Sequence, residues 1–174
     1  MRPQRSEYPD YFHNYIPLAG QDTVIDALAD TKADTLDFIK GLDPALGDFA
    51  YAPGKWTVKE VLIHCIDTER IFSARALGIA RGEKQKALPY DENLYAANCD
   101  AAGREFGDIA EEFELVRNST LFLFHSFSEK ALAMTGEFPA GFTTVNAVGF
   151  TICGHTLHHL AVIKERYLKN NSSN

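Results

Sequence analysis

Apolar residues recur with the period of an α-helix along four long stretches of the sequence, which span residues 22–42, 57–82, 104–127 and 143–169. In the third stretch, for example, Phe106, Ile109, Phe113 and Val116 fall on one helical face. No stretch shows the sustained alternation of apolar and polar residues that marks a half-buried strand. Four helices with one apolar face each bury those faces by packing on one another. The pattern therefore predicts an all-α fold, a four-helix bundle.

Local signals predict where the helices begin and how they are connected. Thr57, followed three residues later by Glu60, forms a capping box, so the second helix should begin there. Thr143 or Thr144 should cap the last helix. The segment EKQKALPYDENLYAANCDAAGREFG, which starts at Glu83, contains Pro, Asn and Gly without sustained periodicity. We expect it to form a long crossover between the second and third helices, holding one short helix.

The chain is long enough for one domain with a sizeable core, and we expect residues 1–174 to form a single bundle domain. The first 20 residues carry four aromatic side chains, Tyr8, Tyr11, Phe12 and Tyr15. Residues 1–20 should therefore pack on the bundle as an N-terminal extension. The sequence NNSSN at 170–174 is expected to be a flexible tail.

Composition excludes several classes of partner. The net charge is −7, from 17 Lys and Arg against 24 Asp and Glu, and no basic stripe is present. Phosphate-backbone binding needs clustered positive charge, so we expect no nucleic-acid partner. No run of about 18 apolar residues occurs, and the N-terminus lacks the apolar run of a signal peptide, so we expect a cytoplasmic protein without membrane contact. The three cysteines lack C-x-x-C spacing, which argues against a disulfide framework or a zinc finger.

Three histidines interrupt helical faces that are otherwise apolar. His155 and His159 share a face of the last helix with Val148 and Ile152, so both imidazoles should point into the bundle. Side chains at i and i+4 lie about 6 Å apart along the helix axis, a spacing that lets two nitrogens converge on one ion. His64 shares the apolar surface of the second helix and can face this pair. Three neutral imidazoles with a water molecule would make a metal site with an open position for substrate.

Structural explanations stand beside the metal hypothesis, because a core histidine is more often simply hydrogen-bonded. His158 lies at the edge of the face that carries His155 and His159. It could be a metal ligand, a hydrogen-bond partner of a ligand, or a partly exposed residue. Asp67, one turn along from the histidine of the second helix, either accepts a hydrogen bond from a ligand histidine or lies in solvent near Arg70. Glu69 is rotated away from that histidine, and we expect it to pair with Arg70 or Arg166.

Three strings of the sequence add a family resemblance: KWTVKEVLIHCIDTERIFSARAL from Lys55, LPYDEN from Leu88 and GHTLHHLAVIKERYL from Gly154. In this order, over residues 56–168, they resemble the DinB-like superfamily, also called the DinB/YfiT-like metalloenzymes. The resemblance implies a four-helix bundle, often dimeric, with a divalent metal held by three histidines. The ligand positions of the family fall on His64, His155 and His159. Members are described as metal-dependent hydrolases or as thiol transferases that act with low-molecular-weight thiols.

The chemistry stays open between several hypotheses. In helical zinc proteases a Glu follows the first histidine as general base, whereas Thr156 occupies that position here, so a protease mechanism is not supported. The leading hypothesis is a metal-dependent enzyme acting on a small molecule, either a hydrolase using metal-activated water or a thiol S-transferase using a metal-bound thiolate. The alternatives are a metal- or ligand-binding bundle without turnover and a purely structural bundle. Zn or Ni is the expected ion, with Fe or Cu as further options.

Overall fold

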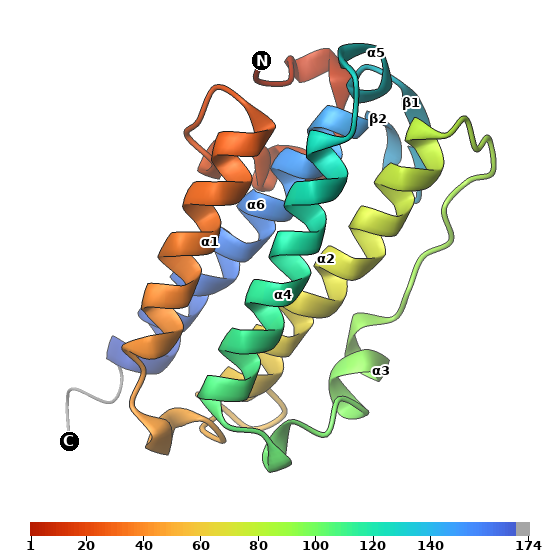
Figure 1. Ribbon diagram of the computed structural model, residues 1–174. Coiled ribbons are helices and arrows are strands. Elements are labelled where there is room, and N and C mark those ends of the chain that lie inside the picture. The colour runs from red at the N-terminus through yellow and green to blue at the C-terminus, as the bar shows by residue number, and fades with distance from the viewer. Residues whose placement is uncertain (170–174) are drawn as a thin grey trace.

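The computed structural model describes residues 1–169 and contains four long helices packed as a bundle (Figure 1). These helices are α1 (Val24–Lys40), α2 (Val58–Ala80), α4 (Phe106–His125) and α6 (Val145–Val162). A short turn, η4 (Pro44–Leu46), lies between α1 and α2, and a π-helix, η6 (Ile163–Leu168), extends α6. The predicted four-helix bundle is present. The segment 170–174, predicted to be a flexible tail, lies outside the described residues.

The helices do not follow one another around the bundle in chain order. Both α1 and α2 pack on α4 and α6, so α1 and α2 occupy opposite corners of the bundle. In Figure 1, α2 and α4 run upward from their first residues, whereas α1 and α6 run downward. The neighbours α2 and α4 are therefore parallel, and the chain has to return along the bundle to connect them.

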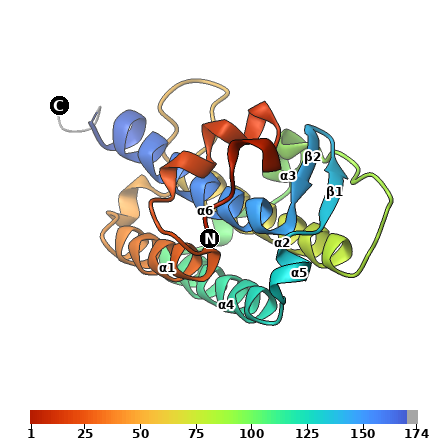
Figure 2. The same cartoon turned by 90° about the horizontal axis from the view of Figure 1, so that it is seen from above.

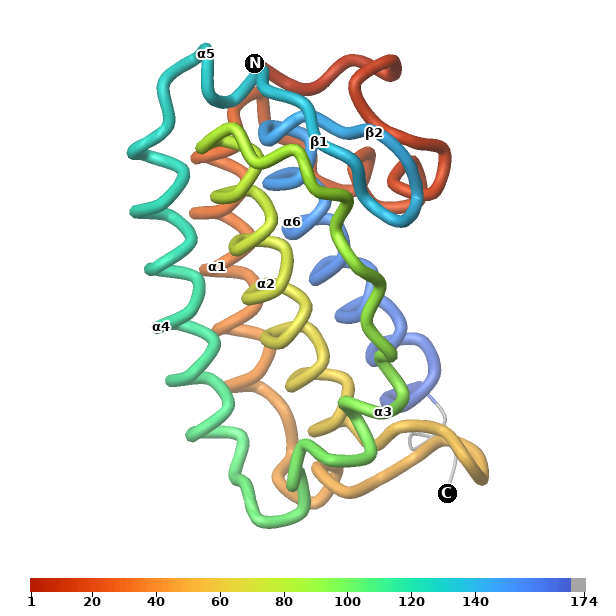
Figure 3. Tube along the Cα trace, turned by 90° about the vertical axis from the view of Figure 1, so that its right-hand side faces the viewer, coloured from red at the N-terminus to blue at the C-terminus, as the bar shows by residue number. Residues whose placement is uncertain are grey.

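The segment 81–105 makes this return along the side of the bundle (Figure 3). It contains the short helix α3 (Glu92–Ala97), which packs on α2, and the turn η5 (Ala101–Gly103). The hydroxyl of Tyr90 lies 2.6 Å from Thr68 Oγ1 on α2. This hydrogen bond fastens the connection to the helix that carries the first of the three histidines.

Side-chain caps fix the starts of the two helices that carry the histidines. Thr57 Oγ1 accepts a hydrogen bond from the Glu60 amide, and Glu60 Oε2 accepts one from the Thr57 amide, so the predicted capping box is confirmed. Thr144 Oγ1 accepts a hydrogen bond from the Ala147 amide, so Thr144 is the cap of α6. Within residues 1–169, none of the helices combines the length and the apolar content that a membrane span requires.

The prediction of a purely α-helical fold is wrong between α4 and α6. After the short helix α5 (Glu129–Leu132), the strands β1 (Thr135–Phe138) and β2 (Gly141–Thr144) form an antiparallel hairpin. Each strand has four residues, too few to show alternation, and each contains a glycine, a residue depleted in strands. Gly136 is needed for packing, because a side chain there would overlap Ile79 of α2. A glycine that reads as a loop signal thus permits a strand to lie against a helix.

Three short turns precede α1; the third packs on α6 and the first packs on β2 (Figure 2). They are η1 (Arg5–Glu7), η2 (Asp10–Asn14) and η3 (Ile16–Leu18). Phe12 and Ile16 are buried in the apolar cluster that includes the first half of α6. A side chain at Gly154 would overlap the backbone carbonyl of Tyr15. This glycine therefore lets the N-terminal segment lie directly against the helix that carries two of the histidines.

A buried ion pair crosses the middle of the bundle. Arg117 of α4 donates from Nε and Nη2 to the two carboxylate oxygens of Glu69 on α2, at 2.8 Å each. Arg117 Nη1 also donates to the Leu28 carbonyl of α1, and both charged side chains are almost fully buried. The sequence-based expectation that Glu69 pairs with Arg70 or Arg166 is therefore wrong. Helical periodicity gave the direction of Glu69, but the partner comes from a third helix.

Candidate metal centre

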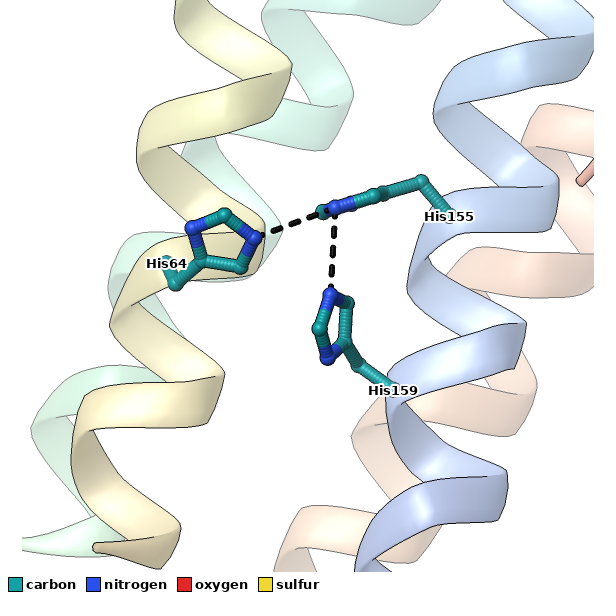
Figure 4. Close-up of side chains that lie close together, drawn as sticks. All are labelled: His64, His155 and His159. Carbon is teal, nitrogen blue, oxygen red and sulfur yellow. Dashed lines mark hydrogen bonds between the residues drawn. The ribbon is translucent and has the colours of Figure 1, made fainter. Parts of the chain in front are cut away.

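Three histidine side chains meet between α2 and α6 (Figure 4). They face a cavity to which the described residues of α1 and α4 contribute nothing, so the expectation that they point into the core of the bundle is wrong. His64 projects from α2, and His155 and His159 project from α6. His155 Nε2 lies 3.1 Å from His64 Nε2 and 3.2 Å from His159 Nε2, and ligand atoms of all three lie within 4.8 Å of one another. The structure thus brings together the three histidines that the sequence singled out, and we call them the histidine cluster.

Two of the three nitrogen–nitrogen separations match those around a tetrahedral cation, and the third is within 4.8 Å. Metal–nitrogen bonds of about 2.0–2.1 Å in tetrahedral geometry hold neighbouring nitrogens about 3.3 Å apart. The two shorter separations in the histidine cluster are 3.1 Å and 3.2 Å. A neutral imidazole nitrogen either donates or accepts a hydrogen bond. Without an ion, His155 Nε2 would therefore have to donate to both neighbouring nitrogens or accept from both. A cation placed between the rings accepts all three lone pairs together.

Burial keeps the cluster in the protonation state that binds metals. Desolvation lowers the pKa of His64 to about 4 and is the first cause of a pKa of about 3 for His159. The pKa of His155 is well below its ordinary value, chiefly through burial and then through the neighbouring histidines. All three imidazoles are therefore neutral near pH 7, with lone pairs available for coordination.

Aromatic rings hold the imidazoles in place. The ring of Trp56 lies 4.8 Å from that of His64, centroid to centroid. Tyr15, from the N-terminal segment, contacts His155 and His158 edge to face at 5.5 Å and 5.6 Å. These contacts restrict ring rotation, so the nitrogens stay aimed at one point.

Of the two further predicted site residues, His158 lies beside the cluster without joining it, and Asp67 faces Arg70 instead. His158 is half-buried between Tyr15 and His159, and it is not one of the converging ligands. The Asp67 carboxylate lies 3.5 Å from Arg70 Nη1, and among residues 1–169 no hydrogen bond joins it to a histidine. Burial raises the pKa of Asp67, and the neighbouring Arg70 opposes that shift.

A cavity of about 570 Å³ opens on the histidine cluster. Its walls come from α2, α6, the N-terminal segment, the 81–105 connection and the hairpin. Aromatic side chains dominate the lining, among them Tyr11, Tyr15, Phe72, Tyr90 and Phe138. The volume is in the range of small-molecule sites, about 300–1,000 Å³.

The model of the DinB superfamily matches residues 27–163, which include all three histidines of the cluster. The chain belongs to the DinB superfamily. No curated protein matches the chain in sequence. The match to the family model confirms the family assignment that the sequence motifs suggested.

Two solved structures show the same fold as this DinB superfamily chain. YfiT from Bacillus subtilis, described as "a probable metal-dependent hydrolase with an unusual four-helix bundle topology", has a TM-score of 0.73 at 19% identity. The match covers 98% of this chain and 94% of that one. A mycothiol-dependent maleylpyruvate isomerase has a TM-score of 0.66 at 13% identity, with 79% of this chain and 58% of that one covered. This chain thus spans little more than half the length of the isomerase.

Sequence reasoning missed part of this DinB superfamily site. Tyr15 was expected only to pack on the bundle, yet it contacts two histidines. Arg75 lines the cavity and was not singled out. A signal for Arg75 was available, because 11 residues after His64 the helix returns to within about 20° of the same face. For Tyr15 no periodic signal exists, since its segment is not a regular helix.

Proposed function

We propose that this chain is a metal-dependent enzyme that acts on a small molecule, with a divalent cation held by His64, His155 and His159. The observation that carries the proposal is the convergence of three neutral Nε2 atoms at the wall of an aromatic cavity. Zn or Ni suits three imidazoles best, and Fe or Cu would also be accepted. When bound, such an ion lowers the pKa of a coordinated water or thiol and polarises a carbonyl.

The remaining roles fall to side chains of the cavity. Burial raises the pKa of Tyr15, with its hydrogen bond to Tyr11 as a further cause, so its phenol keeps its proton. The phenol can donate a hydrogen bond to a substrate oxygen in place of its contact with Tyr11. Trp56, Phe72 and Phe138 offer apolar surface to the body of the substrate and exclude water from it. We assign no general base, since Thr156 occupies the position that a Glu has in zinc proteases.

Two reaction types use this site equally well. Hydrolysis is favoured by the similarity to YfiT, described as a probable metal-dependent hydrolase. Thiol transfer with a low-molecular-weight thiol is favoured by the similarity to a mycothiol-dependent enzyme. A metal-binding bundle without turnover is the alternative. A single domain, a homodimeric state, a cytoplasmic location and the lack of a nucleic-acid partner accompany the proposal as expectations.

Metal content and turnover test the proposal in sequence. Protein made without a His tag is loaded with Zn or Ni, passed through a desalting column and measured by elemental analysis. One ion per chain is expected in the wild type and in His125→Ala, which changes an exposed histidine outside the cluster. Less than a tenth of that metal content is expected in His155→Ala. A metal-free wild type would refute the proposal.

Loaded protein is then assayed with aryl esters and, separately, with thiols plus an electrophile. Turnover that His155→Ala loses and His125→Ala keeps would support an enzyme and identify the reaction type. Stoichiometric metal without turnover in either panel would favour the non-catalytic binding bundle.

A further inference from the structure

Among the described residues that line the cavity, Arg75 is the one Lys or Arg side chain. It lies on α2, 11 residues after His64, on nearly the same face of the helix. At a rise of 1.5 Å per residue, the two backbone positions are about 16 Å apart along the axis. The cavity therefore has a histidine cluster toward one end and a guanidinium toward the other.

The surroundings of Arg75 are aromatic. Its guanidinium carbon lies 5.1 Å from the ring centroid of Phe138, 5.4 Å from that of Phe72 and 6.0 Å from that of Tyr90. Burial among these rings lowers the pKa of Arg75, but a guanidinium stays charged in proteins. The cavity wall thus holds a positive charge that is partly shielded from water.

No acidic side chain neutralises this charge within the described part of the chain. Arg70, on the exposed side of the same helix, pairs with Glu112 at 2.7 Å. Arg75 forms no ion pair with any residue between 1 and 169. Glu92 lines the same cavity and does not pair with it either. A half-buried cation without a counter-ion at the wall of a cavity is an open position for a ligand anion.

A structural role accounts for only part of this arrangement. Arg75 Nη2 donates a hydrogen bond to the Leu88 carbonyl, which ties the 81–105 connection to α2. That bond uses one of the five N–H groups of a guanidinium. The unused groups can form a paired hydrogen bond with a planar carboxylate. Among residues 1–169 the lining contains no lysine and no second arginine, so a more highly charged phosphate would have little to neutralise it.

We propose that Arg75 recognises a carboxylate on the substrate, and that the substrate is an elongated carboxylic acid with an apolar or aromatic body. The carboxylate contacts Arg75, the body lies among Phe72, Phe138 and Trp56, and the reactive group reaches the histidine cluster. This inference rests on the proposed function for the identity of the reacting end. The anion site itself is defined by Arg75 and the rings around it.

The single tryptophan of the sequence provides the assay. Trp56 lines the cavity beside His64, so quenching of its fluorescence reports a ligand that enters the cavity. The probes are 4-phenylbutyrate and its uncharged counterpart 4-phenylbutyramide, titrated into metal-free protein and into zinc-loaded protein. Wild-type protein should bind the acid about 10-fold or more tightly than the amide in both forms, as expected for hydrogen bonds to a charged group.

Two variants with the same change in net charge separate the site from a general field effect. Arg75→Gln should abolish the preference for the acid, because the anion contact is removed, whereas loss of the bond to Leu88 affects acid and amide alike. Arg70→Gln removes an equal charge from the exposed side of α2 and should keep the preference. If Arg75→Gln fails to fold by circular dichroism, Arg75→Lys replaces it and should reduce the preference, because lysine lacks the planar fork.

The outcomes are distinct from those of the metal test. Equal binding of acid and amide by wild-type protein, or a preference that is undiminished in the Arg75 variants, would overturn the proposal. A preference seen only with zinc present would assign the carboxylate to the cation and would also overturn it. A preference that depends on Arg75 in protein that never binds metal would support the anion site while refuting the proposed function.

Discussion

Mild acid should destabilise the metal-free protein through the histidine cluster. Burial lowers the pKa of His64 to about 4, and burial with neighbouring histidines lowers that of His159 to about 3, whereas an unfolded histidine titrates near 6.5. Between these values the unfolded state binds more protons than the folded state, so stability falls as the pH falls. This loss of stability is absent well above pH 6.5 and grows as the pH falls from about 6.5 toward the folded pKa values.

The size of the effect follows from the same pKa values. At pH 5 an unfolded histidine is almost fully protonated while His64 and His159 stay largely neutral, which costs about 2 kcal/mol for each residue. Together they reduce the free energy of unfolding by about 4 kcal/mol, and His155 adds to the loss in the same direction. Domains of this kind have only about 5–15 kcal/mol in total, so the change is large.

Urea denaturation in the presence of a chelator measures this change. The free energy of unfolding is compared at pH 7.5 and pH 5.0 for wild type, His64→Gln and His125→Gln. The pH-dependent loss should be about 2 kcal/mol smaller in His64→Gln, since one buried histidine is gone, and His125→Gln, at an exposed histidine, is the control for loss of an imidazole outside the cluster. Asp67 has a raised pKa and acts in the opposite direction, but it is present in all three proteins and cancels.

Equal pH-dependent losses in wild type and His64→Gln would refute this reasoning. Such a result would mean that His64 titrates alike in the folded and unfolded states. The histidine would then be in contact with water, and the argument that burial keeps the cluster neutral would fail for it.

Three further predictions follow from the same geometry. Alanine at any histidine of the cluster should leave largely metal-free protein, whereas His158→Ala should retain near-stoichiometric metal by elemental analysis; metal lost from His158→Ala but kept in His159→Ala would contradict the ligand set. Chelator should lower the melting temperature of loaded protein, and Zn or Ni should restore it, because ligands from α2 and α6 cross-link the bundle. Arg117→Met should lower the free energy of unfolding by about 3–5 kcal/mol in urea, because Glu69 would stay buried without its partner; a loss below about 1 kcal/mol would contradict a buried pair.

Features set by local periodicity were predictable from the sequence. The rotation of a residue about its own helix depends on its position along that helix, so the shared face of His155 and His159 followed from counting residues. Counting residues did not show that this face is turned toward a cavity beside α2 and α6 rather than toward α1 and α4. The capping box of Thr57 was predictable for a similar reason, since its partner lies only three residues away.

Features set by contacts between distant segments were not predictable in this way. The partner of Glu69 is 48 residues away on another helix, and nothing in the spacing distinguishes Arg117 from the other arginines. The contact of Tyr15 with the histidines depends on how the N-terminal segment crosses α6, which in turn depends on Gly154. The strands of the hairpin pair with each other, but their glycines conceal the pattern.

The order of helices around the bundle belongs to neither group. In a bundle whose helices follow in chain order, α2 would lie diagonally opposite α6, and His64 would face the histidine pair across the centre. In the structure, α2 and α6 are direct neighbours and α1 and α2 are diagonal, which places His64 Nε2 3.1 Å from His155 Nε2. The neighbouring positions of α2 and α6 bring the three histidines together, and the parallel pair α2 and α4 requires the long 81–105 return. The ligand spacing and the length of that connection are thus two consequences of one helix order.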